Sequence, residues 1–282
     1  MAKKLIFLPV IVLSLLIISF ESQANVIVED ADSATQVTAA LAFTSASVLT
    51  GSGQVGDYQI IACGVTTDSG NTFSDPVPGT WEELDTGPCS GNGVCIHGIS
   101  GRIIDNPASE NITCNWALPS VVFAAGSFRY SEVDPIDPII AIECNSGAAD
   151  GGNIMATAPS VITVAGSQVV RIYTYRNFDF EGTMDSNFNS DVEGSFISIA
   201  TLGDVATVSQ QGDTELVLVD GPTGEASIDA GSNAQWRACT IALRMAPEPR
   251  NVPTMSEWGL IAFAAFAGIA GIWYLRRRRV TA

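Results

Sequence analysis

Residues 235–245 read Gln-Trp-Arg-Ala-Cys-Thr-Ile-Ala-Leu-Arg-Met, and this stretch decides the fold class. Successive side chains of a β-strand point to opposite faces, so a strand with one apolar face shows a period of two. The stretch has that period, because its side chains form two alternating rows: Arg237, Cys239, Ile241 and Leu243 in one, and Trp236, Ala238, Thr240 and Ala242 in the other. The pattern predicts a strand.

Similar alternating runs recur between residues 25 and 250, at 58–65, 121–129, 168–176, 195–201 and 215–219. Turn signals rich in Gly, Pro, Asn and Asp separate the runs, and this part of the sequence shows no helical period. About ten short strands without crossover helices indicate an all-β fold, in which the strands pair antiparallel. We expect an antiparallel β-sandwich at 25–245, with a jelly roll as the favoured variant.

The N-terminal 24 residues have the layout of a secretory signal peptide. Lys3 and Lys4 are followed by sixteen uncharged residues at 5–20, and small residues at Ser22 and Ala24 precede the expected cleavage site. The alternative is an uncleaved anchor, but sixteen helical residues span roughly 24 Å, less than the roughly 30 Å of a hydrocarbon core. We therefore predict export and cleavage after Ala24.

An apolar run near the C-terminus predicts a transmembrane helix at 258–275. The run carries no charge, and Trp258, Trp273 and Tyr274 lie near its ends, where aromatic rings favour the membrane interface. Basic residues stay on the cytoplasmic side, which places the preceding chain outside. The basic cluster consists of Arg276, Arg277, Arg278 and Arg279.

The segment before this run carries a recognisable motif: Val252, Pro253, Thr254, Met255, Ser256, Glu257, Trp258 and Gly259. Together with the short span and the terminal arginines, it resembles the IPTL-CTERM sorting tail of Gram-negative bacterial proteins. Val252 stands where the family has Ile, and Met255 where it has Leu. The resemblance implies a tail at 252–282 that an exosortase, a membrane-embedded cysteine transpeptidase, cuts near the motif. It also implies an inner-membrane intermediate, a signal peptidase as a partner, and final display at the cell surface.

The part between the two ends is strongly acidic. Residues 25–250 hold 28 acidic side chains, seven arginines and no lysine, which gives a net charge of −21. A surface of this charge repels nucleic acid and anionic lipid, so nucleic-acid binding is excluded. Residues 246–251 begin Ala-Pro-Glu-Pro and predict a stiff linker to the tail.

All six cysteines lie in the exported part, and an even number in an oxidising compartment favours disulfides. Cys89 and Cys95 flank a Gly-rich loop that a bridge can close. The remaining pairings are expected to be Cys114 with Cys144 and Cys63 with Cys239. A zinc site is the rival interpretation, but no two cysteines have the two-residue spacing of a zinc knuckle.

Enzymatic chemistry finds little support in the sequence. His97 is the only histidine, and the Gly-Ile-Ser-Gly sequence after it is not the Gly-x-Ser-x-Gly turn of an α/β-hydrolase. A structural or surface role is expected for His97. A glycosidase needs two carboxylates across a cleft, and with 28 acidic residues a chance pair proves nothing. The visible clusters, Glu82 with Glu83 and Asp134 with Asp137, are interpreted as a strand edge and a proline-bounded turn.

Two binding sites stay open as hypotheses. The acidic segment at 185–193 places oxygen donors at alternate positions, like the start of a calcium-binding loop, but it lacks the glycine and the glutamate of an EF-hand. Its candidate ligands are Asp185, Asn187, Asn189, Asp191 and Glu193. Tyr173 and Tyr175 fall on one face of a strand and suit either a sugar platform or, as we favour, the core.

A weaker resemblance covers most of the exported part. Gly-Asp at 56–57, Pro-Gly-Thr-Trp at 78–81, Phe-Arg-Tyr-Ser at 128–131 and the strand at 236–243 resemble a β-sandwich of secreted bacterial proteins. This likeness implies a scaffold and no activity. We therefore expect a structural or adhesive surface protein without a cofactor. The alternatives are a module that binds carbohydrate, calcium or a surface polymer, and a glycosidase-like enzyme.

Overall fold

The computed structural model describes residues 27–37, 43–66, 70–90, 95–120, 122–148, 153–176, 192–202, 206–232 and 234–247, and in the tail 263, 265–269 and 273. The chain divides into one unit that ends at Ala246 and another that begins at Pro247. The described tail residues are helical, and among all described residues no helix combines the length and the apolarity that crossing a membrane requires. The signal peptide predicted at 1–24 lies outside the described residues, as does most of the helix predicted at 258–275.

The first half of the β unit consists of two antiparallel sheets. Its inner sheet has the order β1-β8-β3-β6-β5, with bounds Ile27–Val37, Val122–Ser131, Tyr58–Thr66, Cys95–Ile103 and Glu82–Pro88. Its outer sheet has the order β2-β7-β4, with bounds Phe43–Thr50, Glu110–Ser120 and Phe73–Val77.

The second half repeats this arrangement. Its inner sheet has the order β13-β14-β12-β17-β9, with bounds Val192–Leu202, Ala206–Leu216, Gln168–Arg176, Gln235–Leu243 and Ile139–Ala148. Its outer sheet pairs β10 with β16, at Asn153–Ala158 and Ala226–Ser232. Two short strands, β11 and β15, pair at one end, at Ile162–Thr163 and Gly221–Pro222.

Strand pairing within each half is nested, as in a long hairpin that has been rolled up. β1 pairs with β8, β2 with β7 and β3 with β6. The second half shows the same nesting, with β9 paired to β17, β10 to β16 and β12 to β14. This is the winding of a jelly roll. The predicted antiparallel sandwich is confirmed, and the structure contains two such windings in tandem, at 27–131 and 139–243.

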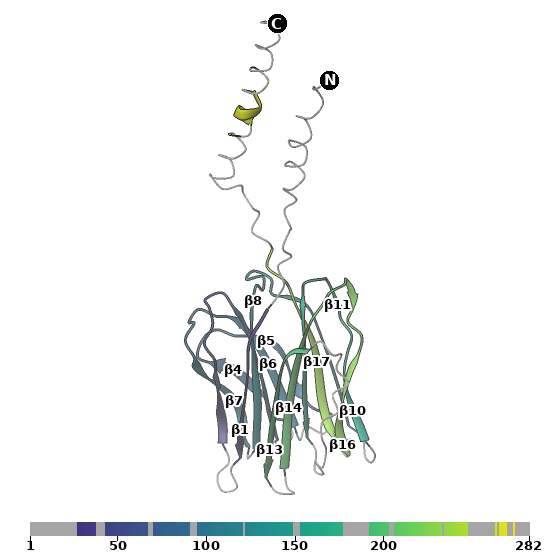
Figure 1. Cartoon of the computed structure of the whole chain (residues 1–282). Coiled ribbons are helices and arrows are strands. Elements are labelled where there is room, and N and C mark those ends of the chain that lie inside the picture. The colour runs from purple at the N-terminus through teal and green to yellow at the C-terminus, as the bar shows by residue number, and fades with distance from the viewer. Residues whose placement is uncertain are drawn as a thin grey trace, which may run out of the picture. The chain divides into compact units, whose positions relative to one another are not determined.

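The two halves pack through their inner sheets in a nearly two-fold arrangement. β1 lies against β13 and β5 against β9, β8 lies against β14 and β6 against β17, and the central strands β3 and β12 face each other. These pairs are related as in an isologous dimer interface, but the two sides are unequal: β1 and β8 pack more closely on β13 and β14 than their counterparts β9 and β17 pack on β5 and β6. Four sheets therefore stack as outer, inner, inner and outer layers (Figure 1).

Stacking in four layers buries both faces of the central strands β3 and β12. Every residue of β3 is buried, and its side chains divide between two cores. Tyr58, Ile60 and Ala62 join the core between the halves, whereas Ile61, Cys63 and Val65 join the core beneath the first outer sheet. The continuous apolar character of these strands follows from burial on both faces.

One predicted strand, at 215–219, is wrong beyond Leu216. β14 ends at Leu216, and the backbone N–H of Val217 still donates to the carbonyl of Ser167, the residue just before β12. Leu218 and Val219 are exposed in the following loop. Their apolar side chains resemble a strand pattern, but the chain pairs again only at Gly221, which opens β15 with a φ of 139°.

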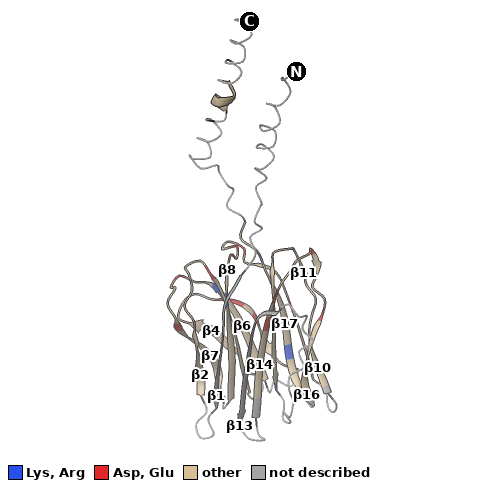
Figure 2. Ribbon diagram, viewed as in Figure 1, with Lys and Arg blue, Asp and Glu red and all other residues tan. Residues whose placement is uncertain are grey.

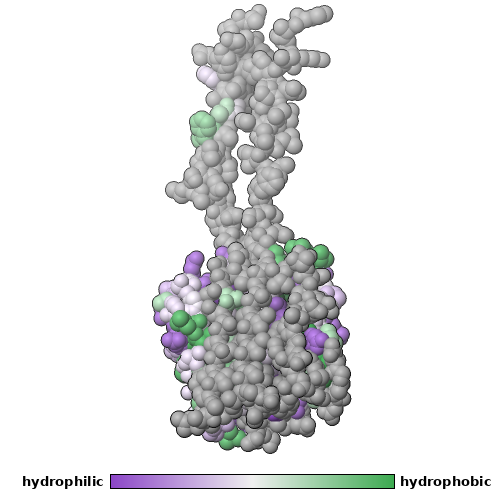
Figure 3. Space-filling view, turned by 60° about the horizontal axis from the view of Figure 1, so that its bottom comes forward, coloured by the Kyte–Doolittle hydropathy of each residue, from purple (hydrophilic) through white to green (hydrophobic). Residues whose placement is uncertain are grey.

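The described surface has few basic groups. In Figure 2 acidic residues are visible mainly on loops and strand ends, and basic residues are rare. Apolar side chains form separate small areas in Figure 3, between white and purple ones. This surface agrees with the acidic composition of residues 25–250.

Candidate functional site

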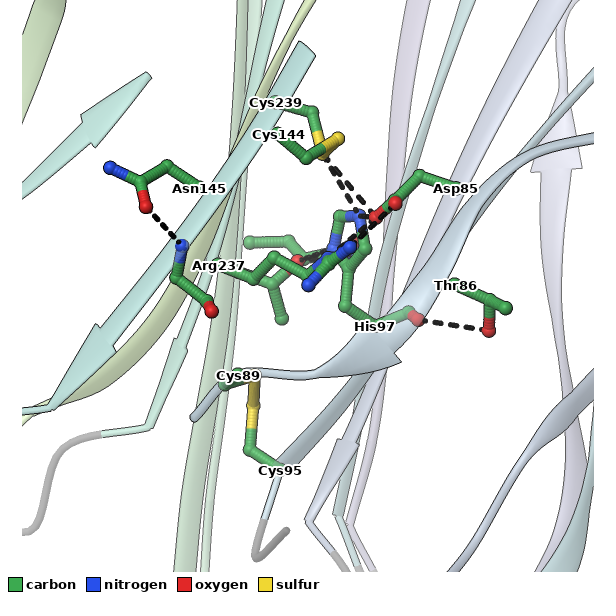
Figure 4. Close-up of polar contacts among 12 residues, drawn as sticks. Asp85, Thr86, Cys89, Cys95, His97, Cys144, Asn145, Arg237 and Cys239 are labelled. Carbon is green, nitrogen blue, oxygen red and sulfur yellow. Dashed lines mark hydrogen bonds and ion pairs between the residues drawn. A yellow bond between two sulfur atoms is a disulfide. The ribbon is translucent and has the colours of Figure 1, made fainter. Parts of the chain in front are cut away.

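The contact between the two halves contains a buried polar cluster (Figure 4). Arg237 lies on β17 and Asp85 on β5, and the guanidinium donates from Nε to Oδ2 and from Nη2 to Oδ1, both at 2.6 Å. Their side chains are only 18% and 14% exposed. Arg237 lies on the same face of β17 as Ile241 and Leu243, so its guanidinium points into the apolar interface. A buried positive charge there is stable only when it is paired, and the Asp85 carboxylate is its partner.

His97 on β6 is the most deeply buried member of this cluster, with a fully covered side chain. Its Nδ1 lies 2.5 Å from the hydroxyl oxygen of Thr174 on β12, which also accepts a hydrogen bond from Gln210. Its Nε2 lies 3.5 Å from Asp85 Oδ2. Burial lowers the pKa of His97 to about 4, although the Asp85 carboxylate acts in the opposite direction. The imidazole is therefore neutral at pH 7, and its contact with Asp85 is not an ion pair.

Cys239 completes the cluster. It follows Arg237 by two positions on β17, so both side chains point into the interface. Its Sγ lies 3.4 Å from Asp85 Oδ2 and 3.8 Å from His97 Nε2, and it is bonded to Cys144 Sγ on the neighbouring strand β9. Within the described residues, Asp85, His97 and Cys239 are the one group of side chains close enough together to hold a metal ion.

This arrangement can act in two ways. With the disulfide closed, it is a neutral polar contact that fixes the register of the two halves, since Asp85 and Arg237 cancel in charge. With the disulfide open, a carboxylate, an imidazole and a thiol share one small space, which is a ligand set that suits zinc.

A second buried polar cluster lies inside the first half. Arg102 donates to Gln59, to Glu110 and to the carbonyl of Pro78, and its guanidinium lies 4.4 Å from the centre of the Trp81 ring. Each of these partners belongs to the same half. The cluster therefore ties the inner sheet to its loops and to β7.

The disulfides confirm one predicted pair and correct two. Cys89 is bonded to Cys95, as predicted from the loop between them. The pairings Cys114–Cys144 and Cys63–Cys239 are wrong: Cys63 is bonded to Cys114, and Cys144 to Cys239.

The layers explain the correction. Cys63 points toward the first outer sheet, where Cys114 lies on β7, whereas Cys239 points into the space between the halves. Cys144 stands directly opposite Cys239 in the ladder of β9 and β17, within one sheet. A bridge from Cys63 to Cys239 would have to pass through an inner sheet.

Other sequence candidates are placed apart from this cluster. Tyr173 and Tyr175 are fully buried beneath the second outer sheet, so the core interpretation is confirmed. Asp134 forms a turn, where its carboxylate accepts from the backbone N–H groups of Ile136 and Asp137. Glu82 and Glu83 are exposed on β5, at the edge of the sheet.

The calcium hypothesis falls almost wholly on residues outside the described ranges. Asp185, Asn187, Asn189 and Asp191 are among them, and of Glu193 only the backbone, in β13, is described. The hypothesis therefore stays a prediction.

Sequence reasoning missed the Asp85 cluster because its members come from strands far apart in the chain. One signal was present. The apolar row of 235–245 contains Arg237, and a charged side chain on an apolar face requires a buried partner.

Comparison with known protein families gives a match in the C-terminal tail. Residues 252–279 match the family model of the IPTL-CTERM motif. The chain ends in a sorting tail. This match confirms the resemblance predicted from the motif and the arginines, and it indicates the C-terminal sorting signal of a secreted, surface-exposed protein that an exosortase-type system processes. Neither the curated proteins nor the solved structures include a match to this chain.

Proposed function

We propose that the chain is anchored in the inner membrane of a Gram-negative bacterium, cut by an exosortase near residues 252–259, and displayed at the surface as a structural or adhesive module. The observation that carries this proposal is the match of residues 252–279 to the sorting motif. Only residues 247–251 separate that motif from the end of the β unit at Ala246. The unit is thus the cargo that the tail delivers.

The properties of the β unit suit such display. Three disulfides cross-link it, and its four main sheets bury a core between each pair of neighbouring layers. Each disulfide limits the unfolded chain, which favours persistence outside the cell, where no chaperone repairs damage. The net charge of −21 at 25–250 keeps neighbouring copies apart and soluble.

The sorting step is tested by the mass of the mature protein in cells with and without the exosortase. We expect a shorter product, lacking the arginine cluster, only where the enzyme is present. Pro253→Ala, inside the motif, should retain the tail, whereas Pro249→Ala, just before it, should be processed normally. An unchanged, tail-bearing mass in both strains would refute the sorting proposal.

The surface role needs a separate measurement. Cells that display the protein are compared with cells in which residues 27–246 are deleted and the signal and tail are kept. We expect the deletion to reduce attachment of cells to one another or to a surface. Equal attachment by both strains, with the protein detected at the surface, would remove the adhesive role and leave a purely structural one.

A further inference from the structure

We propose that Asp85, His97 and Cys239 form a zinc site that the Cys144–Cys239 disulfide closes and that reduction of this disulfide opens. The proposal concerns the interface between the two halves and does not depend on the tail. Its three ligand atoms are Oδ2, Nε2 and Sγ, which lie close together on β5, β6 and β17.

The distances between these atoms already match a tetrahedral zinc centre. Zinc binds oxygen and nitrogen at about 2.0–2.2 Å and sulfur at about 2.3 Å, so two ligands of a tetrahedral zinc ion lie roughly 3.3–3.7 Å apart. The observed separations are 3.5 Å from Asp85 to His97, 3.4 Å from Asp85 to Cys239, and 3.8 Å from His97 to Cys239. Two of these separations lie within that range and the third is slightly longer, so zinc fits after a small side-chain adjustment and without rearrangement of the three strands.

The surrounding side chains orient the ligands as in known zinc sites. A ligand histidine usually has its second ring nitrogen held by a hydrogen bond, and here Thr174 lies 2.5 Å from Nδ1, which leaves Nε2 toward the cluster. Arg237 holds the Asp85 carboxylate in a bidentate contact, yet each carboxylate oxygen keeps a further lone pair for a metal.

Charge balance favours both states of the site. With the disulfide closed, the charges of Asp85 and Arg237 cancel. With the disulfide open and zinc bound, the dication and Arg237 balance the carboxylate and two thiolates, if Cys144 is the fourth ligand. Burial penalises net charge, so Cys144 as the fourth ligand favours the zinc-bound state most, whereas water in that position leaves one positive charge beside the partly exposed Arg237.

The redox step consumes a dithiol. A thiolate of that reductant attacks one sulfur of the Cys144–Cys239 bond, its second thiol closes its own disulfide, and Cys144 and Cys239 each leave as a thiol. Zinc then displaces the proton of Cys239, because only a thiolate is a strong ligand. Water or the thiolate of Cys144 fills the fourth position. Ions enter from the side of Cys144, Asp85 and Arg237, which are partly exposed.

The decisive variant is Cys144→Ser, which prevents the disulfide while it leaves all three ligands in place. Purified wild-type protein with its disulfides closed should bind no zinc at this site, whereas the Cys144→Ser protein should bind zinc without any reductant. Cobalt added instead of zinc should give the absorption of a tetrahedral centre with a thiolate ligand. The Asp85→Asn, His97→Asn and Cys239→Ser changes, each made with Cys144→Ser, should abolish this signal.

Thr174→Val in the Cys144→Ser protein should weaken zinc binding about 10- to 100-fold, because it removes the group that orients His97. Circular dichroism in the aromatic region shows whether each variant is folded. If Cys144→Ser does not fold, wild-type protein reduced by a water-soluble phosphine is compared with reduced Cys144→Ser/Cys239→Ser protein, and the difference in bound zinc is the measure. Equal zinc binding by these two, or equal binding by Cys144→Ser with and without Asp85 and His97, would overturn the proposal.

Discussion

At the scale of single residues, the contact between Asp85 and Arg237 decides how well the two halves fit. Replacing Arg237 with Met leaves the Asp85 carboxylate in a mostly buried position without its partner. We expect a loss of about 2–3 kcal/mol in the free energy of unfolding, below the roughly 3–5 kcal/mol of a fully buried pair because both side chains keep some exposure. Urea unfolding of the purified protein measures it.

The matched control is the double change Asp85→Asn/Arg237→Met, which removes both charges. It should recover a large part of the loss, since no unpaired charge remains. A double variant as unstable as the single one would show that the packing of the arginine stem, and not its charge, stabilises the interface.

Asp213 on β14 predicts a pH dependence. Burial raises its pKa to about 6 from 3.8, although hydrogen bonding to Gln211 and the charge of Arg171 lower it. Between these values the folded protein binds a proton that the unfolded chain does not, so the stabilising contribution is complete below pH 4 and is lost as the pH rises through 6. The shift corresponds to about 3 kcal/mol.

Asp213→Asn is the test, because asparagine is uncharged and can still accept from Gln211. We expect the variant to be more stable than wild type at pH 8, with the difference vanishing toward pH 4. The two proteins are compared by urea unfolding across this range. A difference that is constant with pH would contradict the assignment.

At the scale of elements, the disulfides should differ in their contribution by the length of chain they enclose. Cys63–Cys114 joins an inner strand to an outer one across 51 positions, whereas Cys89–Cys95 closes a hairpin across 6. Chain entropy assigns about 4 kcal/mol to the first and about 2 kcal/mol to the second. Replacing each pair by serines and measuring the melting temperature should give the larger fall for Cys63–Cys114. The reverse order would show that the hairpin bridge has a further role.

The close packing of Tyr58 on β3 against Gly101 on the neighbouring strand β6 predicts a steric limit. A Cβ added at Gly101 would lie 2.7 Å from Tyr58 Cζ and closer still to its hydroxyl oxygen, in a fully buried site. Gly101→Ala should therefore destabilise the protein by about 1–3 kcal/mol. Tyr58→Phe removes the nearest atom and should restore part of this loss, as measured by thermal unfolding. If the double variant Gly101→Ala/Tyr58→Phe recovers no stability, the Tyr58 hydroxyl is not the atom that causes the clash.

At the scale of the whole molecule, each half depends on the other to cover its inner sheet. Ile60 and Phe128 of the first half contact the same core as Ile172 and Ile241 of the second. A chain with only residues 27–131, or only 139–247, would expose this apolar face. We expect each to aggregate or self-associate when produced alone in the exported compartment, and the two together to form a soluble complex. Analytical ultracentrifugation distinguishes these outcomes, and two stable, monomeric halves would contradict the expectation.

The sequence alone determined those features that depend on neighbouring residues. The period of two at 235–245 identified strands, the Gly-rich loop predicted Cys89–Cys95, and the residues of 252–259 predicted the sorting tail. These signals are local, because strand period, short loops and linear motifs are complete within a few residues. The strand predicted at 215–219 shows their limit, since Leu218 and Val219 continue the apolar pattern and yet lie exposed in a loop.

The sequence did not show which of its strands and cysteines lie next to one another in the folded protein. Only the tertiary structure decided that two jelly-roll windings stack through their inner sheets, that Cys63 meets Cys114, and that Asp85, His97 and Cys239 converge. Those contacts join strands that are remote in sequence, and they follow from which apolar face covers which other face. Arg237 stands between the two cases: its place in an apolar row was visible in the sequence, and its partner was decided by the packing of the halves.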